Sequence, residues 1–171
     1  MKIKTTLITC LACLCFSTLA WAQDDDAIKS TVNAYLDGIT KGDTALLGKA
    51  FHPTAILRTF NASTGKIQDF PVRNFIRNTP VGGAKATTKL VGYSYAGVSA
   101  TATVELEFQD FKYIDLLSLL KVNDEWKIVC RVFSRVDKDV QIKGSASSVA
   151  AAKTPAATNK KVVKPKKDDG W

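Results

Sequence analysis

Asp115 is the carboxylate best placed to do chemistry in this sequence, because it lies in an otherwise apolar segment. In a predicted strand over residues 111–122, alternation places Asp115 on the same side as Tyr113, Leu117 and Leu119. A carboxylate in an apolar wall either has a partner or takes a raised pKa. The pattern therefore predicts one of two roles: a general base or ligand anchor in a pocket, or one half of a structural ion pair.

The possible partners of Asp115 decide between these roles. Arg131 lies between Val129 and Phe133 on one face of a predicted strand, so we expect it to point toward the interior. Arg58, Arg73 and His52 are the other possible partners. The candidate ligand-binding residues are Tyr35, His52, Arg58, Tyr113, Asp115 and Arg131.

Asp115 and His52 are also the candidate catalytic residues, with Tyr35 or Tyr113 donating a hydrogen bond to the reacting oxygen. In the structural alternative, Asp115 fixes a strand, His52 caps the chain before Pro53, and both tyrosines belong to the core. The sequence contains a single histidine, no glycine-rich phosphate loop and no nucleophile elbow, so we expect no metal and no cofactor.

Two helices are predicted to precede the strands and to position these residues. The first, over 24–40, carries an apolar stripe at helical spacing and stops at Lys41-Gly42. Asp43 is a predicted N-cap for a short helix over 44–51, which ends at His52-Pro53. The residues of the stripe are Ile28, Val32, Tyr35, Leu36 and Ile39.

The remaining elements are mostly strands. Residues 55–60 and 66–70 form a predicted hairpin, and Pro71 is expected at the first position of a third helix over 72–78. Alternating segments joined by short turns then predict an antiparallel meander. Its strands cover 87–95, 99–109, 111–122 and 126–136. Helices followed by an antiparallel sheet indicate the α+β class.

The two ends of the chain differ from its middle. Residues 1–22 have a positive start, an apolar run and Ala20-Trp21-Ala22, which predicts a signal peptide cleaved after Ala22 and a secreted or periplasmic protein. Lipidation at Cys13 is the alternative. Residues 143–171 are rich in Ala, Lys and Pro, and predict a disordered basic tail.

The net charge of +8 belongs mainly to these ends. Lys2 and Lys4 lie in the signal, and the tail holds seven lysines and two aspartates, which leaves a net charge of +1 on residues 23–142. We therefore expect no nucleic-acid partner for the folded domain. The tail is a solvated spacer or a contact to anionic envelope components.

Three segments resemble landmarks of nuclear transport factor 2-like proteins: 35–43 (YLDGITKGD), 51–55 (FHPTA), and 115–122 (DLLSLLKV) followed by 125–129 (EWKIV). Within that superfamily the chain resembles the SnoaL-like branch and the "putative lumazine-binding" family. The resemblance covers most of residues 26–136. It implies a cystatin-like cone, in which a strongly curved antiparallel sheet packs against N-terminal helices and leaves a pocket at its open end.

Three functions remain open from the sequence. The first is a non-catalytic, exported protein that binds a small apolar or aromatic molecule. The second is a cofactor-free acid–base enzyme of the SnoaL-like cyclase or isomerase type that uses Asp115. The third is an envelope interaction module that forms a homodimer through its sheet.

Overall fold

The first helix covers residues 23–41 in a computed structural model of the chain, which describes residues 23–142. Its predicted apolar stripe is buried, from Ile28 at the start to Ile39 near the end. Within residues 23–142, no helix is long and apolar enough to cross a membrane. The predicted signal peptide and basic tail lie outside the described residues and stay predictions.

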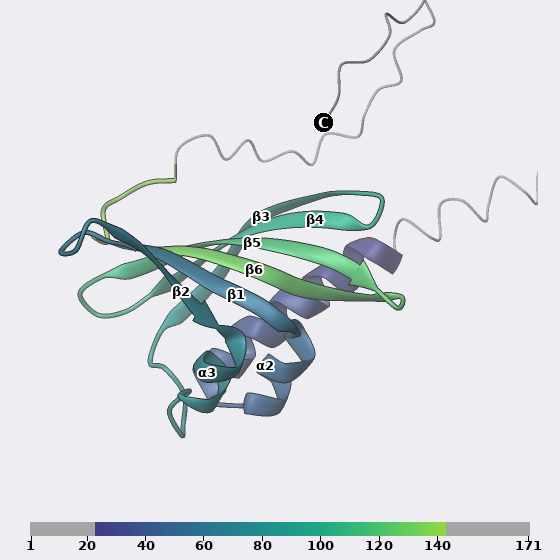
Figure 1. Cartoon of the computed structure of the whole chain (residues 1–171), viewed down its shortest axis with the longest axis horizontal. Helices are drawn as coiled ribbons and strands as arrows, with labels where there is room; N and C mark the ends of the chain where they lie inside the picture. Colours follow the sequence, from purple (N-terminus) through teal and green to yellow (C-terminus); the bar gives the residue numbers. More distant parts are fainter. Residues whose placement is uncertain (1–22, 143–171) are drawn as a thin grey trace, which may run out of the picture.

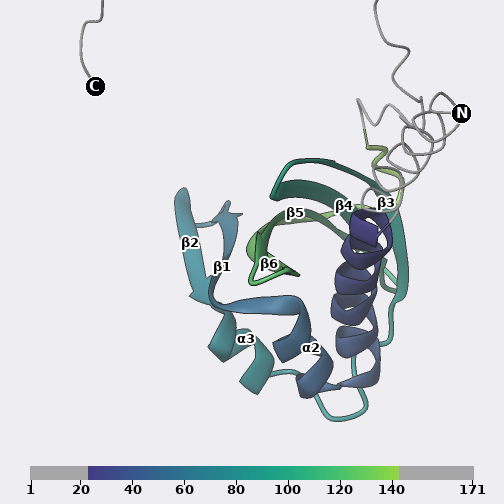
Figure 2. The same ribbon diagram turned by 90° about the vertical axis from the view of Figure 1, so that its right-hand side faces the viewer.

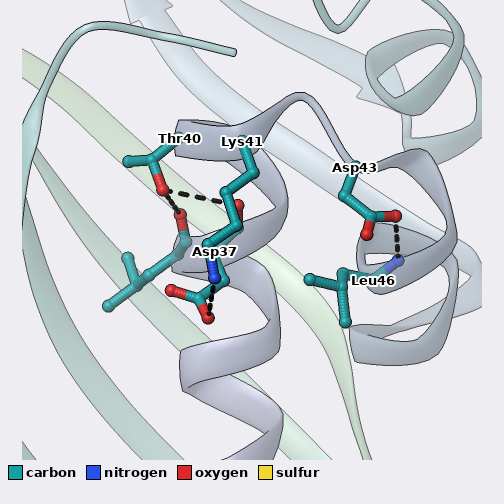
Figure 3. A network of polar contacts seen from close by, with 6 residues as sticks. Asp37, Thr40, Lys41, Asp43 and Leu46 are labelled. Atoms are coloured by element: carbon teal, nitrogen blue, oxygen red, sulfur yellow. Dashed lines mark hydrogen bonds and ion pairs between the residues drawn. The ribbon is translucent and has the colours of Figure 1, made fainter. Parts of the chain in front are cut away.

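The first helix ends where the sequence predicts, and a second helix begins directly after it. Lys41 forms an ion pair with Asp37 over 2.9 Å, and Gly42 then takes a left-handed conformation with φ of 71°. The carboxylate of Asp43 accepts hydrogen bonds from two backbone N–H groups in the first turn of α2 (Thr44–Ala50), as Figure 3 shows for one of them. The predicted N-cap is therefore confirmed.

Six strands form one open, mixed sheet in the order β2-β1-β6-β5-β4-β3. The meander from β3 to β6 is antiparallel, as predicted, but β1 pairs with β6 in parallel. The alternation within a strand shows which side chains are buried, and it does not specify a partner far away in the chain. The strands are β1 (Phe51–Asn61), β2 (Lys66–Pro71), β3 (Thr87–Ala96), β4 (Ser99–Glu107), β5 (Lys112–Val122) and β6 (Glu125–Val136).

The sheet curves strongly, and the helices within residues 23–142 lie on its concave side (Figures 1 and 2). The first helix runs beneath β3 and β4 in Figure 2, while α2 and α3 (Val72–Arg77) lie below β1 and β2. The core fills the space between these layers, with buried residues from β1, β4, β5 and β6 and partly buried ones from β3. This is the α+β arrangement that the sequence predicts.

Two prolines lie in positions that differ from the prediction. β1 begins at Phe51, so Pro53 belongs to a strand instead of separating a helix from one. The β1–β6 register shifts between Phe51 and Ile56, and Pro53 falls in that irregular interval, where a strand tolerates a missing N–H. Pro71 is the N-cap residue of α3 and still pairs with Ile56, so it precedes the first helical position.

Candidate functional site

A buried polar cluster of Asp115, Arg131 and Tyr35 lies inside the concave face of the sheet. Arg131 donates from Nε to Asp115 Oδ2 over 2.9 Å and from Nη2 to Asp115 Oδ1 over 3.0 Å. The hydroxyl of Tyr35, from the first helix, donates to Asp115 Oδ2 over 2.5 Å. The Asp115 carboxylate thus accepts three hydrogen bonds and joins the helix to β5 and β6.

Burial defines the electrostatics of this cluster. Asp115 and Tyr35 are 0% exposed and Arg131 is 5% exposed. Burial raises the pKa of the Tyr35 hydroxyl well above its ordinary value, so Tyr35 stays a donor. Burial lowers the pKa of Arg131, but charge interactions with Tyr35 and Asp115 more than offset this and leave the pKa raised. Arg131 therefore stays a cation in a dry environment.

Aromatic rings hold the guanidinium group of Arg131 from several sides. Its Cζ atom lies 4.2 Å from the ring centre of Phe133, 5.6 Å from that of Phe75 and 5.8 Å from that of Tyr35. Such contacts between a cation and a π face add to the ion pair and restrict the side chain to one orientation.

A pocket of about 410 Å³ lies next to this cluster, and Arg131 forms part of its wall. Its lining residues come from the concave face of the sheet, from α3 and the loop after it, and from the end of the first helix. Asp115 and Tyr35 do not line the pocket, because they lie behind Arg131. The lining residues are mostly apolar: Ile39, Leu57, Phe70, Asn74, Phe75, Asn78, Thr79, Pro80, Ala84, Leu106, Phe108, Tyr113, Arg131 and Phe133.

The loop that closes one side of the pocket is fixed to the end of the first helix. The backbone N–H of Ala84 donates to the carbonyl of Ile39 over 2.8 Å. A Cβ atom on Gly83 would lie 2.1 Å from the carbonyl oxygen of Thr40, so only glycine permits this approach. Pro80 and Ala84 reach the pocket because of this contact.

The structure separates the candidate ligand-binding residues into two groups. Tyr113 and Arg131 line the pocket, and Tyr35 and Asp115 support Arg131 from behind. His52 lies elsewhere, at the start of β1, where its Nδ1 is 2.8 Å from the hydroxyl of Thr54.

Arg58 points to the outer face of the sheet, away from the pocket. Its guanidinium forms two hydrogen bonds of 2.7 Å with Asp69 on β2. Leu116, Leu120 and Val132 are exposed on strands of the same sheet, so apolar side chains also face solvent there. A homodimer through the sheet stays a prediction.

Asn74 and Asn78 are pocket residues that sequence reasoning missed. They lie four positions apart, in the first turn and at the C-cap of α3, and so share one side of this short helix. Their spacing of four in the predicted third helix is the sequence signal that could have identified them as neighbours on one side of that helix. Among residues 23–142, no group of three or more His, Cys, Asp or Glu side chains could hold a metal ion.

Comparisons with known proteins support this fold. The chain is similar to an NTF2-like protein of unknown function from Shewanella baltica, with a TM-score of 0.60, 22% identity, and coverage of 67% of this chain and 95% of that one. An NTF2-like protein of unknown function from Methylobacillus flagellatus gives a TM-score of 0.56 at 27% identity, covering 66% of this chain and 92% of that one.

Two comparisons of the sequence give a similar protein and a matching family. The aldolase FrzH of Cladobotryum sp. is 23% identical over 116 residues, which are 66% of this chain and 91% of that protein. Residues 23–134 match the family described as "Putative lumazine-binding". This match covers more than half of the chain, and the resemblance noted in the sequence is confirmed. The chain therefore belongs to the "Putative lumazine-binding" family of the nuclear transport factor 2-like superfamily.

Proposed function

We propose that the chain binds a small apolar or aromatic molecule in the pocket beside Arg131, without catalysing a reaction. The observation that carries this proposal is the apolar pocket of about 410 Å³ with one rigid cationic group in its wall. Ligand pockets commonly span about 300–1,000 Å³ and combine apolar walls with a few fixed polar groups. The family description, which names a small-molecule ligand, supports the same function.

The chemistry of the lining favours binding over catalysis. Of the described residues that line the pocket, only Arg131 and Tyr113 are titratable. A general base must reach the proton that it abstracts, directly or through one water molecule. Asp115 is fully buried and accepts three hydrogen bonds on the far side of Arg131, so it does not offer such a base to the pocket in this arrangement.

A pocket-filling variant tests the binding function. We expect the neutral fluorescent probe N-phenylnaphthylamine to gain fluorescence with the wild-type protein and with Ala96→Phe, which adds the same ring at an exposed strand end. Ala84→Phe places that ring in the pocket wall and should abolish the gain. Equal fluorescence with both variants would mean that the probe binds elsewhere.

An acid–base enzyme is the second candidate function, and the similarity to an aldolase favours it. Aldol chemistry begins with removal of a proton next to a carbonyl group. Nuclear magnetic resonance in D₂O would detect deuterium entering a ketone at that carbon. Exchange catalysed by the wild-type protein and absent in Asp115→Asn would favour the enzyme, whereas equal background exchange would favour the binding protein.

The chain acts after export, with Gln23 as the first residue of the mature protein. Support comes from the signal pattern and from Asp24 and Asp25, which contact the sheet directly beyond the predicted cleavage point. Asp24 Oδ1 accepts from Lys121 Nζ over 2.8 Å, and Asp25 accepts from the hydroxyl of Tyr93. N-terminal sequencing of the exported protein tests this, and a lipid-modified start at Cys13 would contradict it.

A further inference from the structure

We propose that Arg131 recognises a neutral carbonyl oxygen, so that the pocket selects flat aromatic molecules bearing a ring carbonyl over aromatic anions and cations. This inference rests on the proposed binding function and adds the chemical class of the ligand. It depends on three observations: the orientation of the guanidinium group, the balance of charge in the pocket, and the shape of the aromatic walls.

The guanidinium group has one nitrogen left for a ligand. Nε and Nη2 of Arg131 both donate to Asp115, and no residue in 23–142 accepts a hydrogen bond from Nη1. Every buried side-chain nitrogen and oxygen in that range has a hydrogen-bond partner, so Nη1 is not buried. Because Arg131 lines the pocket and its other two guanidinium nitrogens donate to Asp115, we infer that Nη1 presents its N–H groups to the space that a ligand would fill.

The charge of the site is balanced before any ligand binds. Asp115 neutralises Arg131 at 2.9–3.0 Å, and the other described lining residues carry no charge at neutral pH. A carboxylate ligand would lose its hydration and meet no net positive charge, which disfavours it. An organic cation would likewise lose its hydration and meet no net negative charge, which disfavours it. A neutral carbonyl oxygen accepts from Nη1 and avoids both costs.

The walls favour a flat ring. Ring centres of Phe70 and Phe133 are 6.5 Å apart, those of Phe133 and Tyr113 are 5.9 Å apart, and those of Tyr113 and Phe108 are 5.9 Å apart. This row of rings borders the same pocket as Arg131. Aromatic side chains pack well against another ring through stacked or edge-to-face contacts.

A series of small bicyclic probes tests this selectivity in the wild-type protein. Coumarin carries a ring carbonyl, chromene is the same ring system without it, naphthoate is an anion, and N-methylquinolinium is a cation. We expect coumarin to bind about tenfold tighter than chromene, as for one hydrogen bond from a charged donor. We expect naphthoate and N-methylquinolinium to bind no tighter than chromene. Calorimetry or ligand-observed magnetic resonance gives the dissociation constants.

A matched variant removes the donor without leaving a buried charge. Tyr35→Phe, Asp115→Leu and Arg131→Met together replace the polar cluster by apolar groups, a change that folded proteins often tolerate. The triple variant should bind coumarin and chromene equally. Infrared spectroscopy adds a test that needs no variant, because the carbonyl stretch of bound coumarin should move to lower frequency than in an apolar solvent.

The outcomes separate this inference from the proposed function. Equal binding of coumarin and chromene by the wild-type protein would overturn the selectivity and leave the binding function intact. Binding of naphthoate that is tighter than that of chromene would do the same. An unshifted carbonyl stretch would also overturn it. Failure of every probe to bind the wild-type protein would overturn the proposed binding function itself, and with it the selectivity.

Discussion

Asp115 and Arg131 form a bidentate ion pair across β5 and β6, with both residues almost completely excluded from solvent. The register of the two strands explains the contact, since Leu117 lies opposite Arg131 and Asp115 lies opposite the next inward residue, Phe133. The two charged side chains are therefore diagonal neighbours on one face of the sheet. This pair supports the pocket wall, and its removal affects the fold as well as the site.

Asp115→Asn should destabilise the protein by about 3–5 kcal/mol, because Arg131 would remain buried without a counter-charge. Urea denaturation of the two proteins measures the change. Asp69→Asn is the control, since it breaks a pair with Arg58 that is about half exposed on the outer face, and we expect hardly any shift in the midpoint. A variant of Asp115 as stable as the wild type would mean that the pair contributes nothing to folding.

Part of the site could be predicted because it depends on local patterns. Alternation along single strands correctly places Asp115 and Arg131 on inward faces. The tight turn at Asn123 and Asp124, with φ of 51° and 63°, sets the register from Val122 to Leu119 only. The register then shifts by one residue between Leu119 and Ser118, and this irregularity brings Arg131 to the inward face. Alternation in β1 would also have excluded Arg58 from the interior, because the buried Leu57 precedes it directly.

The rest of the site depends on packing between distant segments. The contact of Ala84 with Ile39 brings a loop to the end of the first helix, and no local pattern specifies it. The parallel pairing of β1 with β6 likewise joins segments that are far apart in the chain. The sequence predicts His52 near Asp115, but His52 is the second residue of β1 and does not line the pocket.

Tyr35→Phe should destabilise the protein by about 1.5–3 kcal/mol, because it removes a buried hydrogen bond to a charged group. Tyr113→Phe is a matched control: among residues 23–142 no hydrogen bond of its hydroxyl is seen, and its ring contacts with Phe108 and Phe133 survive the change. In thermal and urea denaturation, Tyr35→Phe should therefore unfold at a lower midpoint than Tyr113→Phe. Equal stability of both variants would contradict a structural role for the Tyr35 hydroxyl.

Gly83→Ala should destabilise the protein by about 3 kcal/mol or more, since its Cβ would clash with the carbonyl of Thr40. Gly82→Ala separates this clash from backbone strain. Gly82 has a similar φ, 82° against 76°, but its Cβ would meet nothing within 4 Å, so we expect a loss of only about 1–2 kcal/mol. Probe binding should weaken only in Gly83→Ala, and equal losses in both variants would show that the close approach is unimportant.

Asp24 should make the stability of the protein sensitive to acid. Its hydrogen bonds with Lys121 and with the indole N–H of Trp126 lower the pKa of this carboxyl in the folded state. Because the folded pKa is below the unfolded one, the stabilisation is complete above the ordinary carboxyl pKa of about 3.9 and is lost as the pH falls through the folded pKa.

Asp24→Asn should therefore lower the urea midpoint at pH 7, and the difference from the wild type should shrink below about pH 4. Asp26→Asn is the control at pH 7, because Asp26 is exposed and forms no ion pair within residues 23–142, so the urea midpoint of this variant should match that of the wild type there. A difference between Asp24→Asn and the wild type that stays constant from pH 7 to strongly acidic pH would show that the contact does not depend on the charge of Asp24.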